Sequence, residues 1–159
     1  MPFIRTLTNS LELDLDVINL SSPSPELFDE VAQIAAKIVA SNPDSNTINQ
    51  IRRFYDELVT WDHQISASTS EKQELREAIR TSKYEECAPF IKMMNAKVAY
   101  AKGRNQNEKN KDFTGLVDKN FVDLFTYCIR KIDTYKSLKN CKLFFEAFIG
   151  FYKVERPKK

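Results

Sequence analysis

The sequence predicts an all-α protein, a single-domain bundle of five or six helices preceded by an extended N-terminal arm. Apolar residues recur every three or four positions through most of the chain, the period of helices with one buried face. The 159 residues include only 3 glycines and 6 prolines, too few for the turns of an all-β fold. A chain of this length can bury a sizeable core, so we expect one helical domain.

The chain divides into an arm over residues 1–22, a helical bundle over residues 23–153 and a basic tail over residues 154–159. Within the arm, LELDLDVI at residues 11–18 alternates apolar and acidic side chains, which is the period of a strand. No second stretch has this period. We therefore expect an extended arm that lies against the bundle or against a neighbouring subunit.

Helix boundaries follow from capping and breaking residues. Ser70 with Gln73 resembles a capping box, and Ser137 is a further helix cap. Pro89 is expected to begin a helix, and Gly103 to end it. The six helices are expected over approximately residues 25–41, 46–62, 70–84, 89–103, 114–135 and 137–153.

The last of these helices has an unusually wide apolar face. Such width means that the helix is central in the bundle, or that part of it faces another subunit. We expect Phe145 and Phe148, near the middle of the face, to be core residues. Phe144 and Phe151, at its edge, are expected to touch a neighbour.

Charge is divided unevenly along the chain. Residues 1–86 hold 8 basic and 15 acidic residues, a net charge of −7, whereas residues 87–159 hold 16 and 7, a net charge of +9. The basic half is suited to a polyanionic partner. The equally weighted alternative is that the two halves attract one another.

The basic residues concentrate around one helix. Lys92, Lys97, Lys102 and Arg104 lie between residues 87 and 107, where there is no acid. On a helical wheel, Lys97 falls within an apolar face, which suggests a groove with an apolar floor and an anion at its mouth. The alternative is that the lysine stem crosses the edge of the core and places its ammonium in water. That apolar face comprises Phe90, Met93, Met94, Tyr100 and Ala101.

Arg52 and Arg53 form a tandem cationic pair on the second helix. A phosphate backbone requires several cations on one face but no strict spacing, so this pair and the basic helix are candidate phosphate contacts. Tyr100 is suited to stack on a base, although its place on the apolar face favours the core.

The sequence contains no recognisable catalytic set. His63 is the single histidine, which excludes the HExxH motif and Cys/His zinc sites. Its three cysteines are widely spaced and indicate a reduced, cytoplasmic protein. No run of apolar residues is long enough to span a membrane. We expect neither enzymatic activity nor a metal or cofactor.

Three blocks resemble one known family. QIRRFYDEL (residues 50–58), PFIKMMNAKVAYAKGR (89–104) and KNCKLFFEAFIGFYK (139–153) resemble the small subunit of the type III-A CRISPR interference complex, the Csm small-subunit family. The resemblance covers about residues 25–153. A similar subunit is expected in type III-D complexes, which leaves the subtype open.

The resemblance implies a non-catalytic subunit present in several stacked copies beside the backbone and large subunits. It implies contact with the backbone of the CRISPR RNA–target RNA duplex without base specificity. The residues carried over as RNA contacts are Arg52, Arg53, Lys97, Lys102 and Arg104, with Tyr100 and Lys92 as secondary candidates. The alternative function is a helical adaptor that binds only protein and docks its basic face on an acidic partner.

Overall fold

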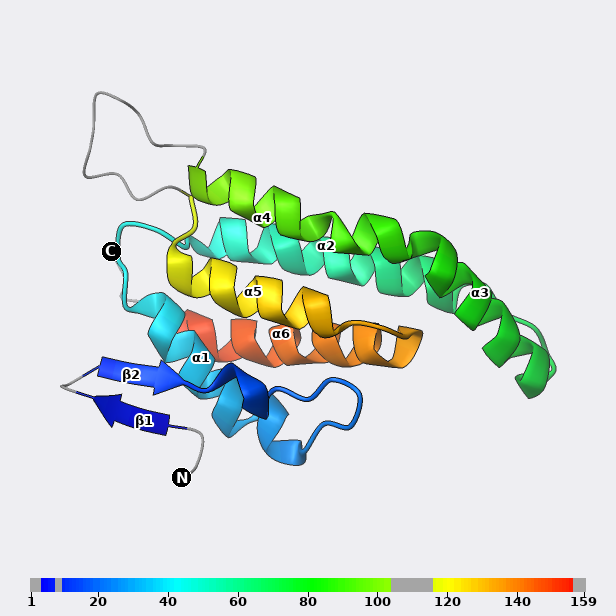
Figure 1. Ribbon diagram of the computed structural model, residues 1–159, viewed down its shortest axis with the longest axis horizontal. Coiled ribbons are helices and arrows are strands. Elements are labelled where there is room, and N and C mark those ends of the chain that lie inside the picture. The colour runs from blue at the N-terminus through cyan, green and yellow to red at the C-terminus, as the bar shows by residue number, and fades with distance from the viewer. Residues whose placement is uncertain (1–3, 8–9, 104–115, 156–159) are drawn as a thin grey trace.

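The structure, a computed structural model, describes residues 4–7, 10–103 and 116–155. Within these ranges most residues are helical, which confirms the predicted all-α bundle (Figure 1). The short 3-10 helices η1 (Leu15–Val17) and η2 (Pro25–Phe28) precede the α-helices. The α-helices are α1 (Glu30–Ala40), α2 (Ile48–Ser66), α3 (Gln73–Lys92), α4 (Met94–Gly103), α5 (Lys119–Lys131) and α6 (Tyr135–Glu155).

The N-terminal arm contains the predicted strand, but that strand is not alone. β1 (Ile4–Leu7) and β2 (Ser10–Leu13) form an antiparallel hairpin. A strand must satisfy its backbone groups, and the preceding segment is the nearest partner along the chain. The expectation of extended backbone through residue 18 was wrong, because the chain turns into η1 after Asp14. Ile18 and Leu20 are buried, so this end of the arm packs on the bundle.

α6 occupies the centre of the bundle and packs most extensively against α1 and α2. Phe144, Phe145 and Phe148 are all buried. The expectation that Phe144 touches a neighbouring subunit was therefore wrong: helices flank α6 on both sides and cover the edge of its face. Phe151 is partly buried against the same core.

The third and fourth helices differ from their predicted boundaries. Pro89 lies inside α3 and does not begin a helix. The helix ends instead with Met93 as its C-cap residue, and α4 begins at Met94. Proline removes one backbone donor, which bends a helix without ending it when the remaining turns are held. Figure 1 shows α3 and α4 following one another as one bent rod. The predicted capping box was also wrong, because Lys72 is the N-cap and its side chain makes no capping hydrogen bond.

Two caps fix the ends of the central helices. Thr134 Oγ1 accepts a hydrogen bond from the Ser137 backbone N–H at 3.1 Å, and Ser137 Oγ accepts one from the Thr134 N–H at 2.9 Å. This is a reciprocal cap in which Thr134 precedes the first residue of α6 and Ser137 is its third residue. The prediction of Ser137 as the cap residue itself was wrong, because the helix begins at Tyr135, two residues earlier than expected. Asp118 caps α5 by accepting a hydrogen bond from the Phe121 N–H at 3.0 Å. None of the helices in the described ranges is both long and apolar enough to cross a membrane.

Candidate nucleic-acid interface

α4 carries two apolar faces, and only one of them enters the core. Met94, Val98 and Ala101 are buried, whereas Met93 and Tyr100 are 56% and 69% exposed. The predicted single apolar face was therefore wrong, because α4 packs on α5 through the buried set and leaves the other stripe in solvent. Phe90, at the end of α3, belongs to this exposed stripe and stacks on Trp61 with ring centroids 5.8 Å apart.

A groove runs between α2 and α4. Its volume is about 360 Å³. Buried Phe54 contributes to its floor, and the small side chain of Ala96 keeps it open. The structure thus brings two predicted RNA-contacting residues, Arg53 and Lys97, to the same groove although they are far apart in the sequence. The lining residues are Arg53, Phe54, Glu57, Met93, Ala96, Lys97 and Tyr100.

Lys97 has an acidic partner that its own segment of the chain lacks. Its Nζ lies 2.5 Å from Oε1 of Glu57 on α2. The Lys97 side chain is 53% exposed, so the ion pair stabilises the fold by only about 0–1 kcal/mol. Sequence reasoning missed Glu57 as a member of this site, because no local pattern shows that α2 and α4 face each other.

The other predicted cations lie around the groove. Arg52 and Lys102 are exposed, on α2 and in the last turn of α4 respectively, but do not line the groove. Among residues that the structure describes, no ion pair is found for Arg52, Arg53 or Lys102. Arg104 lies outside the described residues.

Lys92 contacts the end of a helix. Its Nζ donates hydrogen bonds to the carbonyl oxygens of Ile129 at 2.8 Å and Ile132 at 2.6 Å. A lysine at a helix C-terminus satisfies carbonyls that have no partner within the helix. Burial lowers the pKa of Lys92 from its usual value. Its ammonium is thus engaged with the end of α5, which reduces its availability to a ligand.

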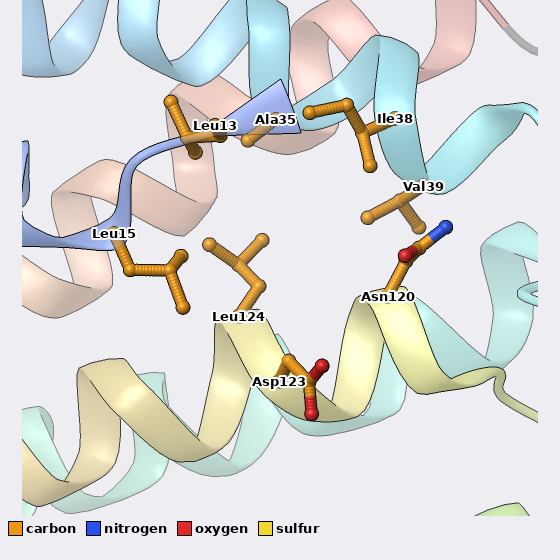
Figure 2. A pocket seen from close by; sticks show the side chains of 8 residues that line it. All are labelled: Leu13, Leu15, Ala35, Ile38, Val39, Asn120, Asp123 and Leu124. Atoms are coloured by element: carbon orange, nitrogen blue, oxygen red, sulfur yellow. The ribbon is translucent and has the colours of Figure 1, made fainter. Parts of the chain in front are cut away.

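A second hollow lies under the N-terminal segment, between α1 and α5 (Figure 2). Its volume is about 230 Å³, and its walls are mostly aliphatic, with Leu15, Val39 and Leu124 pointing inward. Asn120 and Asp123 are its polar residues, and it contains no cation. This hollow therefore lacks the chemistry to hold a phosphate. No group of three metal-ligating side chains occurs in the described part of the chain.

Comparison with protein families gives a match to the family described as Csm2 Type III-A over residues 23–158. Comparisons with curated proteins and with solved structures found no match. The match begins at the end of the arm, spans the whole helical bundle and includes both walls of the α2–α4 groove. The chain therefore belongs to the Csm2 Type III-A family and is a small subunit of the type III-A CRISPR interference complex.

Proposed function

We propose that this subunit contacts the RNA backbone of the CRISPR RNA–target RNA duplex, without base specificity, through cations beside the α2–α4 groove. The observation that carries the proposal is that Arg53 and Lys97 line one groove. Arg52 and Lys102, both exposed, add positive charge on the same two helices. Arg104 follows directly after α4 and belongs to the proposed set by sequence. Several cations on adjoining elements suit a phosphate backbone, whose recognition needs no base contact.

We further propose that the subunit acts without catalysis, in the cytoplasm, in several copies beside the backbone and large subunits. The family supports a place in the complex. Burial raises the pKa of the Cys87 and Cys141 thiols, which disfavours the thiolate that a nucleophile requires. His63 is exposed and is the chain's single histidine.

Replacing Arg53, Lys97 and Lys102 together with alanine tests the RNA contact. Target RNA binding by the assembled complex should weaken. The slope of log affinity against log salt should fall by roughly 2–3, because up to three phosphate contacts are lost. The matched control replaces three exposed lysines outside the groove, Lys37, Lys139 and Lys153, and should change the slope much less. Equal slopes in the groove variant and the wild type would contradict the proposal.

The protein-only adaptor remains the second candidate, and the exposed stripe beside the cations favours it. Phe90 and Met93 are each more than half exposed, as residues at protein interfaces are before assembly. Assembly of the variant without groove cations into the complex distinguishes the two functions. If the subunit is an adaptor, the variant should fail to enter the complex. If the subunit contacts RNA, the variant should be incorporated normally and the complex should bind target RNA less tightly.

A further inference from the structure

We propose that the α2–α4 groove receives one unpaired nucleotide, whose base stacks on the ring of Tyr100 while its phosphate contacts Arg53. This inference rests on the proposed RNA contact and adds the structural class of RNA that the groove recognises. It is carried by the exposure of Tyr100, the shape of the groove and the directions of α2 and α4.

The Tyr100 ring has no evident role in stabilising the described part of the fold. The ring is 69% exposed, and within the described residues it takes part in no hydrogen bond or ring–ring contact. Other tyrosines differ: Tyr152 is buried and its hydroxyl donates to Asn46, and the hydroxyl of Tyr127 donates to Asp16. An exposed aromatic face beside cations is the arrangement on which proteins stack bases of single-stranded nucleic acids.

The groove has the dimensions of a small-molecule site. Its volume of about 360 Å³ falls within the range of about 300–1,000 Å³ that is usual for such sites. Ala96 lies on α4 between Met93, at the junction of α3 and α4, and Tyr100, and its side chain is too small to fill the groove. Met93 adds an exposed, polarizable side chain on the same wall, and thioethers make favourable contacts with aromatic rings.

The directions of the two helices place a cation level with Tyr100. α2 and α4 lie side by side and run in opposite directions (Figure 1). The ion pair between Glu57 and Lys97 shows which residues of the two helices lie at the same level. One turn further along α4 is Tyr100, and one turn back along α2 is Arg53. Arg53 is exposed and has no ion pair among the described residues, so its guanidinium is available to a phosphate at the level of the ring.

A paired nucleotide cannot use this site. Within an A-form duplex each base face is covered by its neighbours, and proteins reach phosphates, 2′-hydroxyls and base edges. Stacking on Tyr100 requires a base face that has left the helical stack. The groove should therefore distinguish unpaired from paired RNA, whereas the surrounding cations contact either form.

The test uses the purified full-length chain and a short RNA that contains 2-aminopurine, either single-stranded or paired with its complement. Wild-type protein should quench the probe in the single strand. Tyr100→Ala should weaken binding of the single strand about tenfold, since stacking contributes about 1–3 kcal/mol per base, and should leave duplex binding unchanged. Tyr100→Phe should bind as the wild type does. Phe90→Ala removes an exposed aromatic outside the groove and should have no effect on RNA binding.

Unchanged single-strand binding by Tyr100→Ala would overturn the inference. Equal losses for single strand and duplex would also overturn it, because they would indicate a general backbone contact. In either case, weaker binding of both RNAs by Arg53→Ala would leave the proposed backbone contact standing. Failure of the wild-type chain to bind single-stranded RNA would overturn the inference as well, while the assembled complex would still test the backbone contact.

Discussion

At the scale of single residues, Lys97 shows that a charge without an acidic neighbour in the sequence can have an acidic partner in the fold. A helical wheel places this lysine on an apolar face, and burying its ammonium there would cost free energy of desolvation. In the structure that face is exposed, and Glu57 on α2 supplies the missing negative charge. In the proposed RNA contact, this carboxylate would compete with any phosphate that approaches Lys97.

Glu57→Gln should strengthen RNA binding by the assembled complex. Removing one negative charge about 4 Å from a phosphate contributes about 1 kcal/mol in a high-dielectric setting, which corresponds to about fivefold in affinity. The gain should shrink as salt is raised, because the groove is open to screening. Stability should change by no more than about 1 kcal/mol, since Lys97 is half exposed. Affinity measured at two salt concentrations checks the prediction.

The matched control is Glu74→Gln, which removes an exposed acid near the start of α3, outside the groove. It should leave RNA affinity unchanged. If Glu57→Gln bound RNA no better than this control, the Glu57–Lys97 pair would not be competing with phosphate.

At the scale of elements, α6 shows why the width of an apolar face does not locate its edge. The face is broad because α1 and α2 cover it from two sides. Phe144 lies beside Phe145 at a centroid distance of 5.2 Å and is fully buried. Phe151 lies on the outer part of the face and is only partly buried.

Phe144→Ala should destabilise the free protein by about 3–5 kcal/mol, as the loss of a buried phenylalanine usually does. Phe148→Ala should have a similar effect, since Phe148 is equally buried. Phe151→Ala should cost only about 1 kcal/mol, near the centre of measured single-substitution effects. Urea unfolding of the three variants would measure these differences. A similar loss for Phe151→Ala would place that residue in the core, and it would remove the basis for its expected contact with a neighbour.

At the scale of the whole molecule, the uneven distribution of charge has two consequences. Among the described residues, two ion pairs join the acidic first half to the basic second half: Glu57 with Lys97, and Asp62 with Lys142. The attraction between halves is thus part of the fold. It uses only some of the cations of the second half, since Lys102 has no ion pair in the described part of the chain.

The two cross-half pairs should differ in their contributions to stability. The Asp62–Lys142 pair spans 3.2 Å with side chains 13% and 20% exposed. Asp62→Asn should therefore lower the free energy of unfolding by about 1–3 kcal/mol, because it leaves a nearly buried ammonium without its charged partner. RNA binding should not change, since Asp62 does not line the groove. Urea unfolding and an RNA titration of the same variant check both parts.

A spectroscopic signal accompanies this change. Burial, followed by a hydrogen bond to Asp62, raises the pKa of Tyr135 to about 12. Removing the carboxylate should lower that pKa, which absorbance titration of the tyrosines would detect. Asp62→Asn could instead prove no less stable than Glu57→Gln and leave the tyrosine titration unchanged. The Asp62–Lys142 pair would then stabilise the fold no more than the exposed Glu57–Lys97 pair does.

The sequence by itself determined the all-α class, the approximate positions of the helices and the family, because helical period, caps and motifs are properties of neighbouring residues. It also identified Arg53 and Lys97 as candidate cations. Only the tertiary structure decided which stripe of α4 is buried, since α4 offers two and packing against α5 selects one. It also decided that Lys92 binds the end of α5, and that Lys97 faces Glu57 across a groove. These outcomes depend on contacts between distant segments, which no local pattern of residue types specifies.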